Sequence, residues 1–144
     1  MLYEVHIVEA VCGKLIKLGY TIDQKLETTQ QGFDIIASKN NQEQSVKLYI
    51  EAKGETSSQE GTNRFGKVFT SGQVREHIGQ ALYKVAEIFS LDQPTCEIRA
   101  AIALPKNKNH LDQVKKIQKA LDRWGIVVFW VSDELNVEIQ PFLI

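Results

Sequence analysis

The sequence predicts an α/β fold in which a mixed central sheet is flanked by helices. Three segments place apolar residues at helical spacing, and the other apolar runs have the length of strands. Two of those runs, "CEIRAAIAL" and "IVVFWV", are largely apolar on both faces, as expected of strands that helices cover on both sides. Because strands alternate with helices in the second half of the chain, the helices are expected to pack against the sheet.

The first half of the chain is predicted to contain one helix and three strands. The helix covers residues 3–18, where apolar side chains recur at helical spacing and Gly19 supplies a stop. Three extended runs separated by turn-forming residues follow, namely "YTIDQKL", "FDIIAS" and "SVKLYIEAK". Consecutive strands joined by short turns are usually neighbours, so these three are expected to form an antiparallel meander.

The second half is predicted to alternate helices with strands. A helix over about residues 71–89 precedes "CEIRAAIAL", a helix over about residues 111–124 precedes "IVVFWV", and the extended run "NVEIQPF" follows. Before these helices, residues 54–71 lack an apolar period, and a connection of this length is usually functional or mobile. With 144 residues and 43% hydrophobic content, residues 1–144 are expected to form a single domain.

The composition argues against several classes of protein. No apolar run is long enough to span a membrane, and the first residues carry no basic region of the kind that begins a secretory signal. Cys12 and Cys96 lack partners at metal-ligand spacing, so they are expected to be reduced thiols in a cytoplasmic protein. Sequences typical of phosphate-binding or dinucleotide-binding loops are absent as well.

The net charge of −1 hides an uneven distribution along the chain. Lys and Arg number 6 against 9 acids in residues 1–60, 11 against 6 in residues 61–125, and 0 against 3 in residues 126–144. A basic middle beside an acidic start suits a protein whose acids hold a cation while its bases meet phosphates. Solvated helix surfaces give the same composition, so both interpretations stay open at this point.

The strand at residues 45–53 ends in two charged side chains on one face. Side chains alternate along a strand, so Glu51 and Lys53 point the same way, opposite to an apolar set. That apolar set is Val46, Leu48, Ile50 and Ala52. A purely structural strand does not need the charged pair. The alternative is a solvated pair on the sheet surface, which contributes little energy.

Asp34, from the preceding predicted strand, is expected to lie close to Glu51. Two carboxylates that meet repel each other unless a cation lies between them or one is protonated. Mg²⁺ (or Mn²⁺) is the simplest cation, since it takes oxygen ligands, and the backbone carbonyl of Ala52 is a further candidate ligand. Lys53 is then placed to position an attacking water and to stabilise charge on a phosphate, which predicts phosphodiester hydrolysis. For Asp34 the alternative is a turn-forming residue after Gly32.

The segments "GFDII" and "IEAKG", with an acid-bearing helix before them and a helix and apolar strand after them, resemble the PD-(D/E)xK restriction-endonuclease-like superfamily. The resemblance covers residues 4–104 and implies an α-β-β-β-α-β core, with the rest of the chain as an extension. It implies that Asp34 and Glu51 are metal ligands and that Lys53 is the catalytic lysine. Gly-Phe stands where the superfamily often has a proline-containing dipeptide before the aspartate. The outline is similar to junction resolvases and Mrr-like restriction domains, and it implies a homodimer.

The resemblance also implies that an acid of the first helix is a further metal ligand. The superfamily often adds an acid from this helix to the metal site, and Glu9, at the border of the apolar stripe, is the candidate. Glu4 is the rival, but it lies in the first helical turn, where the helix dipole already explains an acid.

Three residues are candidates for binding DNA. Arg64 and Lys67, in the polar segment before the second helix, are candidates for clamping a backbone phosphate; the alternative is an exposed loop with incidental charges. Gln73 is the third, because some branches of the superfamily carry a glutamine on this helix. In "TSGQ", however, it also completes a capping box. A polar stripe along the same helix faces either substrate or water, and consists of Gln73, His77, Gln80 and Lys84.

The sequence therefore predicts a Mg²⁺-dependent nuclease that hydrolyses phosphodiester bonds in DNA, with RNA as a substrate left open. The alternative is a catalytically inactive module of the same fold that binds DNA or a protein partner as a regulatory factor. The intact set of Asp34, Glu51 and Lys53 favours the enzyme.

Overall fold

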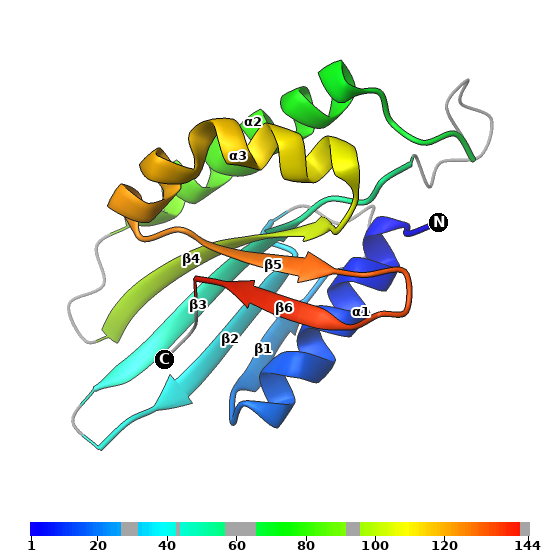
Figure 1. The fold of residues 1–144 in the computed structure, drawn as a ribbon. Helices are drawn as coiled ribbons and strands as arrows, with labels where there is room; N and C mark the ends of the chain where they lie inside the picture. Colours follow the sequence, from blue (N-terminus) through cyan, green and yellow to red (C-terminus); the bar gives the residue numbers. More distant parts are fainter. Residues whose placement is uncertain (27–31, 43, 57–65, 92–95, 142–144) are drawn as a thin grey trace.

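A six-stranded mixed sheet with helices on both faces organises the structure, which is a computed structural model (Figure 1). The structure describes residues 1–26, 32–42, 44–56, 66–91 and 96–141. In chain order, the elements within these residues are α1 (Glu4–Lys17), β1 (Thr21–Lys25), β2 (Ile35–Asn40), β3 (Ser45–Ala52), α2 (Ser71–Phe89), β4 (Cys96–Pro105), α3 (Lys108–Trp124), β5 (Val127–Val131) and β6 (Val137–Gln140). The predicted fold class and the α-β-β-β-α-β order of the core are confirmed.

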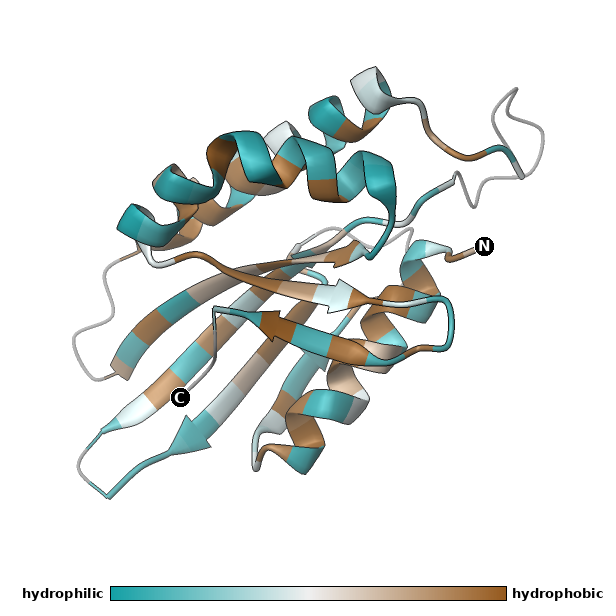
Figure 2. Cartoon of the chain, viewed as in Figure 1, coloured by the Kyte–Doolittle hydropathy of each residue, from teal (hydrophilic) through white to brown (hydrophobic). Residues whose placement is uncertain are grey.

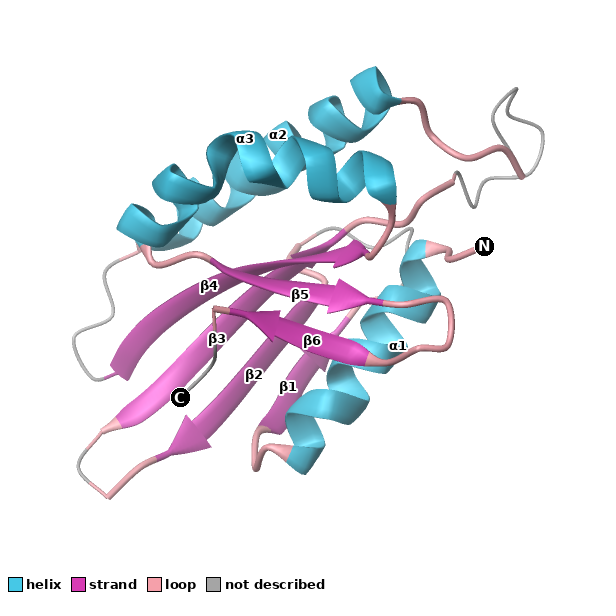
Figure 3. Ribbon diagram, in the orientation of Figure 1, coloured by secondary structure: helices cyan, strands magenta, loops and turns pink. Residues whose placement is uncertain are grey.

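The strands follow one another across the sheet in chain order, from β1 to β6. The first three form the predicted antiparallel meander, β3, β4 and β5 run parallel, and β6 returns antiparallel to β5. Parallel neighbours need crossover connections, and crossovers are right-handed, so α2 and α3 are expected on the same face. Figure 3 shows these two helices on one face of the sheet and α1 on the other.

Two hydrophobic cores fill the space between the sheet and its helices. One lies under α1 and includes Ile7, and the other lies under α2 and α3 and includes Ile78. Figure 2 shows that β5 is hydrophobic along most of its length, whereas α3 is largely hydrophilic on the side seen there. Because helices cover both faces of β3, the face that carries Tyr49 and Glu51 is buried as well. No helix among the described residues is long and apolar enough to cross a membrane.

Two element boundaries differ from the prediction for local reasons. The helix α3 begins at Lys108 rather than near residue 111, because the Asn107 side chain accepts a hydrogen bond from the His110 N–H at 3.0 Å and caps the helix. The strand β2 begins at Ile35, so Asp34 stands just before the strand instead of within it.

Candidate active site

Asp34 and Glu51 face each other at the end of the β2–β3 pair. The antiparallel register pairs Ile35 with Ile50, so one step further along each chain Asp34 stands opposite Glu51. Both residues are buried, with exposures of 7% and 2%. The Ala52 N–H donates a hydrogen bond of 2.7 Å to Asp34 Oδ2, which fixes the aspartate against the end of β3. The structure therefore brings together the two carboxylates that the sequence places on neighbouring strands.

Two lysines bring positive charge to Glu51. Lys53 Nζ lies 3.6 Å from Glu51 Oε1, and Lys84 Nζ, from α2, lies 3.1 Å from the same oxygen. Lys84 also donates a hydrogen bond of 2.9 Å to the Gly32 carbonyl. The sequence puts Lys84 on the polar stripe of its helix but gives it no role, because only the packing of α2 over β3 brings it to Glu51.

Burial raises the pKa of both carboxyl groups. For Asp34, burial is the main cause, and the Ala52 N–H and the charges of Lys84 and Lys53 oppose it. For Glu51, burial comes first and the charge of Asp34 adds to it, while the two lysines again lower the pKa. Glu51 Oε2 is buried and has no hydrogen-bond partner in the described part of the chain. A buried carboxylate oxygen without a partner is unfavourable, so a bound cation would stabilise the site here.

Glu4, in the first turn of α1, joins these two carboxylates. Its pKa is raised to about 7, first by burial and then by the negative charge of Asp34, with Lys53 opposing the shift. The close approach depends on Gly54, where a Cβ would lie 2.6 Å from the backbone nitrogen of Glu4. We call Glu4, Asp34 and Glu51 the acid group.

Glu55 fastens the crossing between α1 and the end of β3. Its N–H donates to the Leu2 carbonyl at 2.9 Å, and its Oε1 accepts from the Leu2 N–H at 2.6 Å. Its Oε2 accepts from Asn107 Nδ2 at 3.0 Å, at the start of α3. This buried carboxylate therefore holds the segment before α1 in place, and with it Glu4.

The predicted metal ligand Glu9 lies elsewhere. Its Oε1 is 2.6 Å from Lys25 Nζ on β1, and both side chains are exposed. Among the described residues, the charges that act on Asp34 and Glu51 do not include Glu9. A helical wheel shows on which side of a helix an acid lies, but not whether its position along the helix axis brings it close to another element. In α1 it is the first turn that lies next to the end of β3. The structure therefore places Glu9 in an ion pair with Lys25 on β1, and Glu4 is the α1 acid whose charge is coupled to those of Asp34 and Glu51.

The three candidate DNA-binding residues have different outcomes. Arg64 lies outside the described residues. Lys67 is exposed, and its carbonyl accepts a hydrogen bond of 2.5 Å from Thr56 Oγ1. Gln73 forms the predicted capping box, since its Oε1 accepts from the Thr70 N–H at 2.9 Å and Thr70 Oγ1 accepts from the Gln73 N–H at 3.3 Å. The capping role of Gln73 is thus the one that the structure displays.

His77 lies between this site and α3. Its ring packs edge-on against Phe69, with ring centroids 4.4 Å apart. Burial lowers the pKa of His77, and the positive charge of Lys53 lowers it further. His110, on α3, is fully buried, and burial together with the charge of His77 lowers its pKa to about 4. Both imidazoles are therefore mainly neutral at neutral pH, and the position of His77 near Lys53 is one that its sequence context does not predict.

The acid group has the donor chemistry of a hard divalent cation site. Among the described residues, no three His, Cys, Asp or Glu side chains are arranged to hold a metal ion by themselves. Mg²⁺ needs fewer, because it commonly binds through one or two carboxylates and keeps several waters. Asp34 and Glu51 supply two carboxylates. Glu51 Oε2 has no hydrogen-bond partner within the described chain, so this oxygen is available to coordinate a metal ion. The residues present therefore fit Mg²⁺ with much of its coordination left to water and substrate.

Comparisons with known proteins give two structural neighbours. One is an fdxN element excision controlling factor protein from Anabaena variabilis, with 12% identity and a TM-score of 0.42 over 93% of this chain and 96% of that one. The other is an XisH family protein from Nostoc punctiforme, with 14% identity and a TM-score of 0.45 over 92% and 96% of the two chains. At these values neither neighbour indicates what this chain does. No protein-family model and no curated protein matches the sequence.

Proposed function

We propose that this chain is a Mg²⁺-dependent nuclease of the PD-(D/E)xK restriction-endonuclease-like type, which hydrolyses phosphodiester bonds in DNA. The observation that carries the proposal is the buried pair of Asp34 and Glu51, with Glu51 Oε2 unpartnered in the described chain and Lys53 beside it. Like charges opposite each other on paired strands destabilise a sheet. A role in holding a cation accounts for both the pair and its unpartnered oxygen.

Each residue of the site has a separate task in this proposal. Asp34 and Glu51 would hold the ion, with the Ala52 carbonyl as a further oxygen. A bound Mg²⁺ (or Mn²⁺) supplies positive charge that polarises a phosphoryl oxygen and makes a nearby water more acidic. Lys53 orients the attacking water and stabilises the negative charge that develops on the phosphate. Glu4, whose charge is coupled to those of Asp34 and Glu51, would add negative charge that attracts the ion.

Cleavage assays with Mg²⁺, Mn²⁺ or a chelator test the proposal. Cleavage is expected with either metal and not with the chelator, and folded Asp34→Ala and Lys53→Ala proteins are expected to lose it. Glu9→Gln is the matched control, because Glu9 shares a helix with Glu4 but lies outside the acid group. Undiminished cleavage by both alanine variants overturns the assignment. Parallel reactions on linear, nicked, branched and single-stranded DNA and on RNA identify the substrate.

A catalytically inactive module that binds DNA or a protein as a regulatory factor is the second candidate. It is favoured by the two lysines at Glu51 Oε1, which give this carboxylate positive charge without a metal ion. Calorimetric titration with Mg²⁺ and Mn²⁺ separates the candidates. The nuclease is expected to give a binding heat that Asp34→Ala abolishes, and the inactive module is expected to give none.

A further inference from the structure

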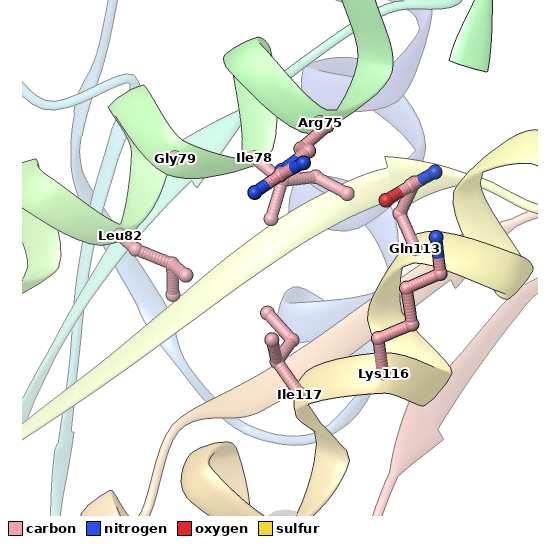
Figure 4. A pocket seen from close by; sticks show the side chains of 7 residues that line it. All are labelled: Arg75, Ile78, Gly79, Leu82, Gln113, Lys116 and Ile117. Carbon is pink, nitrogen blue, oxygen red and sulfur yellow. The ribbon is translucent and has the colours of Figure 1, made fainter. Parts of the chain in front are cut away.

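A groove lies between α2 and α3 on the outside of the helical layer (Figure 4). Its walls are apolar, with Ile78 and Leu82 on α2 and Ile117 on α3, and its volume is about 370 Å³. A cavity of about 150 Å³ already accepts a benzene-sized group, so this groove has room for a leucine side chain. At Gly79, which also lines the groove, an added Cβ would meet no atom within 4 Å, so a partner can approach the backbone closely.

Arg75 and Lys116 bring two positive charges to the same groove, one from each helix. Among the described residues, neither takes part in an ion pair. An apolar groove with unpaired cations fits an apolar side chain that has carboxylates next to it.

The turn between β5 and β6 presents that chemistry. Leu135 is 50% exposed and follows two exposed acids, Asp133 and Glu134. Its φ of 66° is a left-handed conformation that suits Gly or Asn and strains a leucine. Two hydrogen bonds to Ser132 fix the turn, from the Leu135 N–H to the carbonyl at 2.9 Å and from the Asn136 N–H to Oγ at 3.1 Å. An apolar side chain is thus held exposed on a pre-organised turn, where glycine would relieve the strain.

We propose that the Leu135 turn of one copy of this chain docks into the α2–α3 groove of a second copy. Leu135 fills the apolar groove, and Asp133 and Glu134 pair with Arg75 and Lys116. A strained residue persists where its side chain has a purpose, and contact with a second copy supplies one. Neither surface includes a residue of the acid group, so the inference stands apart from the proposed nuclease activity.

Charge reversal tests the pairing, with sedimentation velocity over a series of protein concentrations as the measurement. The wild-type chain is expected to self-associate, and R75E/K116E and D133K/E134K are each expected to weaken association about tenfold or more. The variant with all four changes is expected to associate again, because the reversed charges pair. A wild-type chain that is monomeric throughout, or a folded fourfold variant that does not recover, overturns the proposal.

Leu135→Gly separates association from folding. Glycine adopts a φ of 66° without strain, so the variant is expected to unfold at a higher temperature than wild type at concentrations where both are monomeric. Its self-association is expected to be about tenfold weaker, because the apolar side chain is gone. Ile16→Ala is the control, since it removes an apolar residue that is 61% exposed on α1, outside both surfaces. Association that survives Leu135→Gly, or that Ile16→Ala weakens equally, contradicts the proposal.

The same two cations have the chemistry to bind nucleic acid phosphates, and the groove variant also measures this. The affinity of R75E/K116E for DNA is expected to equal that of wild type when both are compared as monomers. If the affinity for DNA falls while self-association measured by sedimentation is unchanged, the groove is a nucleic-acid-binding surface and the proposal is overturned.

Discussion

Two ion pairs of this chain join the same chemical groups, but the glutamate is exposed in one pair and buried in the other. Lys25 Nζ lies 2.6 Å from Glu9 Oε1, and the two side chains are 44% and 58% exposed. Lys84 Nζ lies 3.1 Å from Glu51 Oε1, and here the lysine is 38% and the glutamate only 3% exposed. Water and salt screen the first pair, whereas removing a partner from a buried carboxylate leaves an uncompensated charge. Removing the lysine from the longer of the two pairs is therefore expected to destabilise the chain more, because it leaves a buried carboxylate with less compensating charge.

The same contrast separates the two acids of α1. Glu9 faces β1 and water, whereas Glu4 shares its surroundings with Asp34 and Glu51 and has a pKa of about 7. Their chemistry is identical, so the difference comes from where the helix meets the rest of the chain. Four substitutions test these contrasts, and they follow in order of expected effect.

The largest effect is expected from Gly54→Ala, which disturbs the placement of Glu4. The new Cβ would lie 2.6 Å from the Glu4 nitrogen and 3.0 Å from the Leu2 carbonyl, and these backbone atoms cannot rotate away. A loss of about 3 kcal/mol in the free energy of unfolding is expected, measured by urea denaturation. Gly13→Ala is the control, because its Cβ would meet no atom within 4 Å in α1, and it is expected to stabilise the chain by about 1 kcal/mol. Equal effects of the two changes contradict this account of the crossing.

Lys84→Met is expected to have the next largest effect. It removes one of the two cations at Glu51 Oε1 and the hydrogen bond to the Gly32 carbonyl. Because Lys84 is partly exposed and Lys53 remains, a loss of about 2 kcal/mol is expected, below the value for a fully buried pair. Lys25→Met, at the exposed pair, is the matched variant and is expected to change stability by about 0.5 kcal/mol or less. Urea denaturation of both variants checks the comparison, and it fails if Lys25→Met costs as much as Lys84→Met.

Glu4→Gln is expected to change how stability depends on pH. Folding raises the pKa of Glu4 from 4.5 to about 7, so between these values the folded chain binds more protons than the unfolded chain. Wild-type stability therefore falls through this pH range as Glu4 loses its proton. Glutamine does not ionise, so the variant is expected to gain on wild type as the pH rises through the range. Denaturation at several pH values measures this, and a difference that does not vary with pH contradicts it.

The smallest effect is expected from Glu9→Gln. The change weakens an exposed ion pair with Lys25 and leaves the acid group untouched, so stability is expected to change by about 0.5 kcal/mol or less. Under the proposed function, Mg²⁺ binding is expected to be unchanged by Glu9→Gln and reduced by Glu4→Gln. Isothermal titration of both variants makes the comparison, and the opposite ranking would return Glu9 to the site.

Strand geometry explains why part of the site could be predicted from the sequence. Alternation along β3 puts Glu51 and Lys53 on one face, and the short connections of the meander make β2 its neighbour, which brings Asp34 opposite Glu51. These are local rules of period and connection, and they need no knowledge of how the helices pack. The sheet of helix-flanked strands follows from the same rules.

The rest of the site depends on packing that no local pattern contains. Glu4 reaches the carboxylates because Gly54 admits the start of α1 and Glu55 holds it there. Lys84 reaches Glu51 because α2 packs over the sheet at a position along its axis that brings these two side chains together. The spacing of apolar residues gives the buried side of a helix, but its position along its own axis is decided by contacts between distant segments.

The acid group and the Leu135 turn come from different parts of the chain. Among the described residues, the acid group and the two lysines beside it come from α1, β3, α2 and the residues next to β2 and β3, all before residue 90. The turn that carries Leu135, in contrast, joins the last two strands. Since β6 lies at the opposite edge of the sheet from β1, the β5–β6 hairpin can vary in length or composition without reaching the acid group. Under the two proposals, catalysis would use the region around β3 and self-association the last hairpin, so substitutions in the hairpin are expected to alter self-association while leaving the acid group intact.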